Sequence, residues 1–131
     1  MRTDDQSQQI MTTLEAYLRL FPDFESEAIT STIMVPYCYS GDGRTTELPT
    51  KEAFLAFRDE YMARVASSAR SARLIRFDAY RIGRSIALAD VESARLNASG
   101  GETTRARTLF ILHKADSQWL IGAAITGVGN S

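Results

Sequence analysis

The sequence predicts an α+β fold in which three N-terminal helices pack on one face of a strongly curved, mostly antiparallel sheet. Helical patterns and a connecting loop fill residues 4–69, whereas strand-like runs joined by short turns fill residues 72–126. Helices followed by hairpin-connected strands form separate layers, because each layer buries its apolar face against the other. The space between two such layers can hold a small molecule.

Composition narrows the classes of function that this chain can serve. Its 131 residues suit one domain, which we assign to residues 1–131. The net charge of −1 calls for no charged partner. Six arginines gather between residues 64 and 84, but they are spread over a helix end, a linker and a strand. We therefore expect solvated or interface ion pairs there and no nucleic-acid groove.

Cysteine and histidine are scarce. Cys38 is the only cysteine, so an internal disulfide is impossible and a reducing cytoplasm is the expected compartment. The first nine residues are polar and acidic, unlike a secretory signal, and no apolar run reaches about 20 residues, the length of a membrane helix. His113 is the only histidine, which leaves too few ligands for a typical zinc site. We expect a cytoplasmic protein with no metal, no other cofactor and no membrane segment.

Three segments carry helical signals. The first begins near Thr3 or Asp4, in a stretch that resembles a capping box, and ends at Pro22. Its inward stripe consists of apolar residues three and four positions apart: Ile10, Met11, Leu14, Tyr17, Leu18 and Phe21. A short second helix runs to about Thr32. A third follows Thr50, a good N-cap, and carries the apolar residues Phe54, Phe57, Tyr61 and Val65.

Strand signals follow a different period. Residues 34–39 form a short apolar run that Pro36 restricts to an edge or a bend, and a turn at 40–43 leads into a polar loop. From Ala72 the apolar period becomes two, which predicts hairpin-connected strands at 72–81, 84–96, 103–114 and 118–126. Strands this long must twist and bend to wrap the helices, so we expect bulges and a cavity inside the curve.

This arrangement resembles the SnoaL-like branch of the nuclear transport factor 2-like superfamily. The resemblance rests on the helix–breaker–helix at 10–32, the turn at 40–43 and the closing segment DSQWLI at 116–121, and it spans nearly the whole chain. It implies a cystatin-like cone of three helices over a curved sheet, often dimeric through the outer sheet face. Members include ketosteroid isomerases, polyketide cyclases, dehydratases, epoxide hydrolases and catalytically silent binding or assembly domains.

The resemblance implies specific positions for catalytic groups. In ketosteroid isomerases a first-helix tyrosine donates to the enolate, a strand carboxylate moves the proton, and a protonated acid in the sheet donates a second hydrogen bond. The tyrosine corresponds to Tyr17, the base falls near Ser40 with Asp42 two residues away, and the sheet acid falls near Thr108. Neither serine nor threonine moves a proton without a partner base, so this match argues against steroid isomerisation.

Asp90 is the candidate acid or base, with Tyr17 as a hydrogen-bond donor. Asp90 interrupts an apolar strand, and a carboxylate that points into an apolar cavity would have a raised pKa. The alternative is a structural carboxylate paired with a cross-strand arginine such as Arg76 or Arg107. For Tyr17 the alternative is a core aromatic residue whose hydroxyl binds a carbonyl.

Ligand contacts are expected from both layers. Tyr37 and Tyr39 share one face of the short strand beside the 40–48 loop, which suits a pocket mouth as well as it suits plain surface packing. The third helix and the strand at 103–114 complete the candidate binding set, which is Tyr37, Tyr39, Phe57, Tyr61, Thr108 and Phe110.

Both faces of the strand at 103–114 are apolar. Leu109 and Ile111 alternate with the residues assigned to the pocket, so they lie on the outer face. A second subunit would cover such a face, and we therefore expect a homodimer.

We interpret the chain as a domain that binds a small apolar molecule between helices and sheet. One alternative is a lyase, isomerase or hydrolase that acts on a small apolar, polyketide-like or steroid-like substrate through Asp90 and Tyr17. Another is an assembly domain whose cavity is filled by side chains. A pocket that holds a desolvated Asp90 favours the enzyme, an apolar pocket without a carboxylate favours binding, and no pocket favours assembly.

Overall fold

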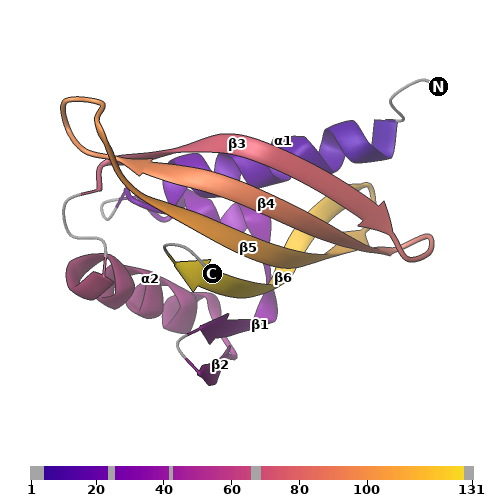
Figure 1. Ribbon diagram of the computed structural model, residues 1–131. Helices are drawn as coiled ribbons and strands as arrows, with labels where there is room; N and C mark the ends of the chain where they lie inside the picture. The colour runs from indigo at the N-terminus through magenta and orange to yellow at the C-terminus, as the bar shows by residue number, and fades with distance from the viewer. Residues whose placement is uncertain (1–4, 24–25, 42, 66–68, 129–131) are drawn as a thin grey trace.

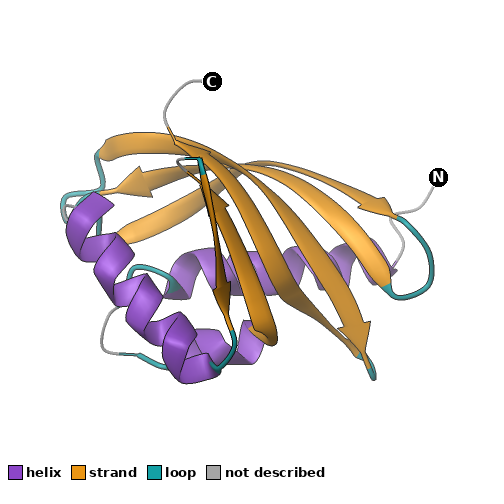
Figure 2. Ribbon diagram, turned by 90° about the horizontal axis from the view of Figure 1, so that it is seen from below, coloured by secondary structure: helices purple, strands orange, loops and turns teal. Residues whose placement is uncertain are grey.

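The computed structural model of the chain describes residues 5–23, 26–41, 43–65 and 69–128. Its strands form one curved sheet, and both α-helices lie on the inner side of the curve (Figure 1, Figure 2). The elements follow the chain as α1 (Asp5–Leu20), η1 (Ala28–Thr32), β1 (Ile33–Gly41), β2 (Arg44–Leu48), α2 (Lys51–Val65), β3 (Ser71–Arg81), β4 (Ile86–Leu96), β5 (Glu102–Ala115) and β6 (Gln118–Val128).

The sheet has six strands in the order β2-β1-β6-β5-β4-β3. All neighbouring strands pair antiparallel except β1 and β6, which run parallel. The predicted α+β class and the mostly antiparallel sheet are confirmed. The four predicted long strands correspond to β3, β4, β5 and β6.

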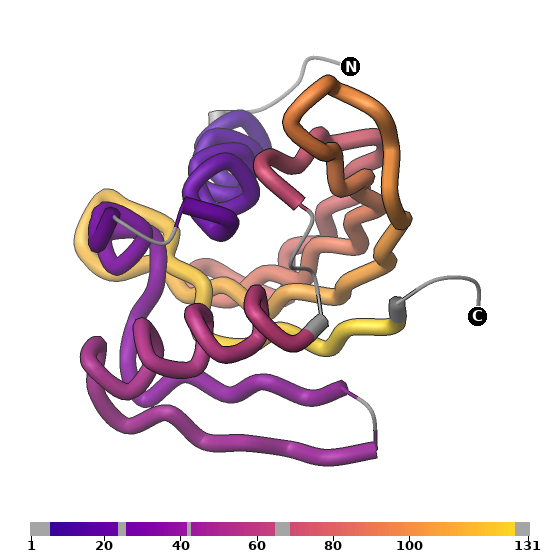
Figure 3. Tube along the Cα trace, turned by 90° about the vertical axis from the view of Figure 1, so that its left-hand side faces the viewer, coloured from indigo at the N-terminus to yellow at the C-terminus, as the bar shows by residue number. Residues whose placement is uncertain are grey.

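Bulges bend this sheet around the helices. Ile75 is an extra residue in β3, since Leu74 pairs with Ser93 and Arg76 with Glu92. A second irregularity places Gly122 of β6 outside the regular pairing with β5. An extra residue on one strand increases the local twist of the sheet. Figure 3 shows the sheet curling around the helices.

The first and third predicted helices are confirmed as α1 and α2. In α1 the buried residues are spaced as the apolar stripe predicts: Ile10, Leu14 and Tyr17. In α2 the predicted cap Thr50 accepts a hydrogen bond from the Ala53 N–H at 3.0 Å. Thr3 and Asp4, the predicted start of α1, lie outside the described residues. Neither α1 nor α2, nor any other helix in the described ranges, is long and apolar enough to cross a membrane.

The prediction of three helices is wrong, because the middle segment folds as the single 3₁₀ turn η1. Its hydroxyl side chains donate to backbone carbonyls three residues earlier, including Thr32 Oγ1 to Ile29 O at 2.7 Å and Ser31 Oγ to Ala28 O at 2.8 Å. Such bonds favour a tight turn over a continuing α-helix. Ile29 and Thr32 are buried and attach the turn to the core.

The polar loop predicted after the turn at 40–43 is also wrong, because Arg44–Leu48 forms β2. It pairs with β1 from Gly41 to Tyr37, and its last residue, Leu48, is buried. Asp42 in the turn lies outside the described residues. The predicted bend at Pro36 is confirmed, since the pairing of β1 with β6 shifts between Ile33 and Cys38.

Trp119 attaches α1 to the sheet. The side chain is 1% exposed, and its Nε1–H donates to Gln6 Oε1 at 2.9 Å. The Thr13 hydroxyl donates to the Trp119 carbonyl at 2.9 Å. These bonds align α1 along β6, so that Tyr17, one turn further along the helix, faces the interior of the curve.

Candidate functional site

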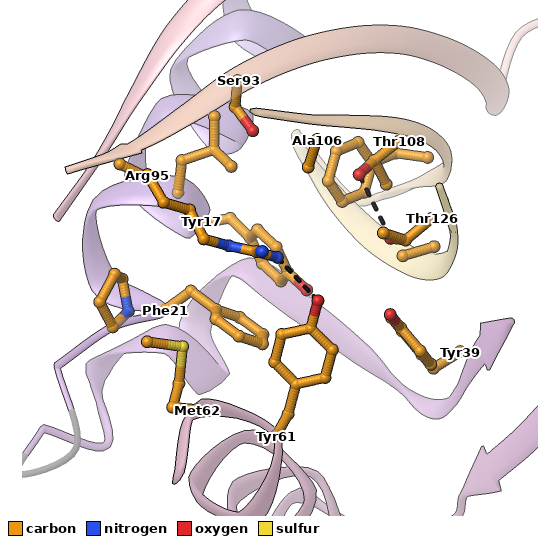
Figure 4. Close-up of a pocket in the computed structure, with 15 residues that line it drawn as sticks. Tyr17, Phe21, Tyr39, Tyr61, Met62, Ser93, Arg95, Ala106, Thr108 and Thr126 are labelled. Atoms are coloured by element: carbon orange, nitrogen blue, oxygen red, sulfur yellow. Dashed lines mark hydrogen bonds between the residues drawn. The ribbon is translucent and has the colours of Figure 1, made fainter. Parts of the chain in front are cut away.

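A cavity of about 50 Å³ lies between α1, α2 and the inner face of β3 to β6 (Figure 4). Aromatic and aliphatic side chains form most of its wall, among them Leu18, Phe21, Met62 and Phe110. A cavity of this size has room for several waters or a small chemical group, whereas drug-sized ligands occupy about 300 Å³ or more. Its polar groups are few and come from different elements.

Tyr17 contributes a hydroxyl from α1. It lies 2.8 Å from the Tyr37 hydroxyl of β1, and either oxygen can donate to the other. Burial raises the pKa of Tyr17 well above its ordinary value, and burial likewise raises the pKa of Tyr37. Both hydroxyls therefore stay protonated at physiological pH. This pair can donate a hydrogen bond to a ligand, but it cannot act as a base.

Arg95 brings a positive charge to the same cavity from the end of β4. Its Nη2–H donates to the Tyr61 hydroxyl at 2.7 Å, a contact drawn in Figure 4, and its Cζ lies 5.4 Å from the centre of the Tyr61 ring. Sequence analysis did not identify this residue. Its parity was the available signal, because Arg95 lies two and four residues after Ser93 and Val91 and therefore shares their inward face.

Hydroxyl groups line the sheet wall. Thr108 of β5 and Thr126 of β6 share a hydrogen bond of 3.2 Å (Figure 4), and Ser93 of β4 lies on the same wall. Thr108, near which the resemblance places the isomerase sheet acid, thus lines the cavity with a hydroxyl and no carboxyl group. Ser40, the position expected for the base, is outside this cavity and bonds the Thr45 hydroxyl at 2.9 Å in the β1–β2 hairpin.

The expected position of Asp90 in the cavity is wrong. Asp90 lies on the outer face of the sheet, where its carboxylate accepts hydrogen bonds from Arg107 at 2.7 and 3.0 Å and from Arg76 at 3.2 Å. The Arg107 hydrogen bonds, with smaller help from Arg76, hold the pKa of Asp90 below its ordinary value. The alternative interpretation of a cross-strand ion pair is confirmed. Asp90 thus lacks the raised pKa on which a catalytic role depended.

Asp90 lies outside because the inner residues of β4 are Ala87, Ala89 and Val91, which are buried in the same core cluster as Ile10 and Leu14 of α1. Asp90 has the opposite parity and lies with Leu88 and Glu92. In the described part of the chain, no group of three His, Cys, Asp or Glu side chains could hold a metal ion.

The six predicted ligand-binding residues divide between three places. Tyr39, Tyr61, Thr108 and Phe110 line the cavity, whereas Tyr37 lies behind it in the core. Phe57 lines a second hollow of about 550 Å³ between α2 and the β1–β2 hairpin, which we name the side groove. Its lining residues are Tyr39, Gly41, Arg44, Thr46, Phe57, Glu60, Tyr61 and Arg64.

Tyr39 and Tyr61 line both hollows and form the wall between them. Their rings meet edge to face, with centroids 5.8 Å apart.

Solved structures similar to this one share its fold. A protein of unknown function with a cystatin-like fold from Nostoc punctiforme superposes with a TM-score of 0.80 at 14% identity, over 100% of this chain and 97% of that chain. An NTF2-like protein with a cystatin-like fold from Novosphingobium aromaticivorans gives 0.70 at 17% identity, over 91% and 79%. A ketosteroid isomerase-like protein from Erwinia carotovora atroseptica gives 0.70 at 17% identity, over 98% and 100%. At these identities the likeness shows the fold alone.

Sequence comparison identifies the family. No curated protein matches the chain. The family model described as NTF2-like protein (DUF6841) matches residues 5–127. This match confirms the resemblance to the nuclear transport factor 2-like superfamily, and because it spans almost the whole chain, the protein belongs to the NTF2-like protein family (DUF6841).

Proposed function

We propose that this protein binds a small, largely apolar molecule in the cavity between α1 and the sheet. One observation carries the proposal: the cavity is walled by aromatic rings and hydroxyl groups, and its described lining residues include no carboxylate. An apolar wall with a few convergent polar groups is the usual composition of a small-molecule site. A ligand of more than one ring, the probe indole included, would need Tyr39 or Tyr61 to turn toward the side groove.

The same observation weighs against acid–base catalysis. Proton transfer near neutral pH needs a group with a suitable pKa within hydrogen-bond reach of the substrate. The described lining residues that ionise are tyrosines and Arg95, and burial raises the pKa of Tyr17 further from neutrality. The lyase, isomerase and hydrolase alternatives therefore have no base among the described residues that line this cavity.

A cavity-filling substitution tests ligand binding. Ala106 lies on the cavity wall and is 4% exposed, so Ala106→Leu places new atoms where the ligand would lie. We expect this change to lower the affinity for the neutral probe indole about tenfold or more, equivalent to about 1.4 kcal/mol, in an NMR titration.

The matched control is Ala56→Leu on the exposed surface of α2, which should bind indole as the wild type does. Circular dichroism verifies that both variants fold, because extra core atoms can cost about 1–3 kcal/mol. Equal indole affinity in Ala106→Leu and wild type would refute binding in this cavity.

We also propose that two copies pair through the outer face of the sheet. Large apolar side chains gather there: Tyr80 is 54% exposed and Ile125 47%, and Leu88, Leu109 and Ile111 lie between them. Cross-strand pairing makes them neighbours, since Tyr80 pairs with Leu88, Leu88 with Ile111, and Leu109 with Ile125. A continuous apolar patch on a sheet face suits a self-complementary contact with a second copy.

A further inference from the structure

We propose that the ligand of this cavity is a small carboxylate with an apolar body, and that Arg95 binds its carboxylate group. This inference rests on the proposed binding function and adds the charge and chemical class of the ligand. It starts from the one cation among the described lining residues, which lies in an otherwise apolar cavity.

Arg95 differs from the arginines around it in having no acidic partner within the described residues. On the outer face of the same sheet, Arg73, Arg76, Arg105 and Arg107 each lie within ion-pair distance of an Asp or Glu. Arg95 instead points inward to a cavity whose described lining residues contain no carboxylate. A half-buried guanidinium loses part of its hydration, and a ligand anion would restore that lost interaction.

Tyr61 holds the Arg95 guanidinium in place. One N–H donates to the Tyr61 hydroxyl at 2.7 Å, and another reaches Thr104 Oγ1 at 3.5 Å. An arginine has five N–H donors, so the described residues leave three of them without a hydrogen-bond acceptor. Because the group is already ordered against the Tyr61 ring, less conformational entropy is lost when a carboxylate accepts two parallel hydrogen bonds from it.

The sheet wall adds neutral donors that suit the same anion. Thr108 and Thr126 share one hydrogen bond, which uses the hydrogen of one hydroxyl and leaves that of the other available. Phe21, Met62 and Phe110 supply apolar surface for the body of the ligand. A single arginine surrounded by neutral hydroxyls matches a singly charged group, and the small cavity volume limits the body to about one ring.

Paired aromatic probes of nearly equal shape test the charge preference. Benzoate and benzamide are both planar, but only benzoate is charged at neutral pH. We expect an NMR titration of the wild-type protein to show benzoate binding about tenfold more tightly than benzamide, with shifts at Phe110 and at the Arg95 Nε–H. Arg95→Met should abolish this preference while benzamide binding persists, and Arg95→Lys should keep part of it.

The control is Arg73→Met, which removes a 57% exposed guanidinium from the outer face and should leave the tenfold preference unchanged. Equal binding of the two probes to wild type, or a preference that survives in Arg95→Met, would overturn the carboxylate inference and leave cavity binding standing. Failure of the wild-type protein to bind indole in the cavity would overturn both the carboxylate inference and the proposed binding function. If Arg95→Met fails to fold, the comparison of probes on wild type still decides.

Discussion

At the scale of single residues, Arg58 shows how a charged side chain can belong to the core. It is 1% exposed, yet it lies on the buried stripe of α2, four residues after Phe54 and three before Tyr61. Its guanidinium donates to the carbonyls of Leu20 at 3.2 Å and Ser26 at 2.9 Å, and to the Asp59 carboxylate at 2.7 Å. It thereby ties the last residue of α1, Leu20, to Ser26 in the segment that follows, and it adds to the hydrogen bond that the Leu20 carbonyl accepts from the Asp23 N–H.

Replacing this arginine should be costly for stability. We expect Arg58→Met to lower the free energy of unfolding by about 3 kcal/mol, because the Leu20 and Ser26 carbonyls lose charge-assisted hydrogen bonds inside the protein. Urea denaturation followed by circular dichroism measures the change. Arg64→Met, at an exposed position of the same helix, should stay within about 0.5 kcal/mol of wild type, and an equal loss in both variants would contradict this role.

At the scale of elements, long strands were predictable and short ones were not. In β4, buried and partly exposed residues alternate over most of the strand, and that period is visible without any tertiary contact. In β2 only Leu48 is apolar and buried, so the segment shows no apolar period and its sequence predicts a loop. Pairing with β1 makes it a strand. Likewise, the hydroxyl residues of η1 allow either a helix or a turn, and only their bonds to nearby carbonyls decide.

The hydroxyl pair Tyr17 and Tyr37 links α1 to β1 and offers a test of that contact. Tyr17→Phe should cost about 1–3 kcal/mol, because it leaves the buried Tyr37 hydroxyl without its partner. Adding Tyr37→Phe should cost less than the same change alone, with a coupling energy of about 1 kcal/mol in denaturation experiments. Strictly additive losses would show that the two hydroxyls do not interact.

At the scale of the whole molecule, the curvature of the sheet gives its two faces different environments. The inner face of β4 and β5 covers the helices and bounds the cavity, whereas the outer face carries the Asp90 ion pairs next to the apolar patch around Ile111. One face therefore serves the proposed ligand, and the other serves the proposed second copy.

Charge placed in that patch should separate the copies. Ile111→Glu puts a carboxylate at the centre of the apolar surface, where pairing would bury it without a partner. We expect sedimentation equilibrium to give a dimer for wild type and a monomer for this variant. Ala56→Glu on exposed α2 should remain dimeric. A wild-type monomer, or an Ile111→Glu dimer of unchanged stability, would refute the interface.

The sequence by itself determined the order of layers, the long strands, the two α-helices and most of the aromatic cavity wall, because the helical and strand periods are properties of neighbouring residues. Tyr17, Tyr39, Tyr61 and Phe110 were all found in this way, and the structure places them at the cavity. Only the tertiary structure decided which face of β4 is the inner one. Alternation separates Asp90 from Val91 but gives both faces of β4 apolar residues, so the packing of the core against one face was needed to turn Asp90 outward and Arg95 inward.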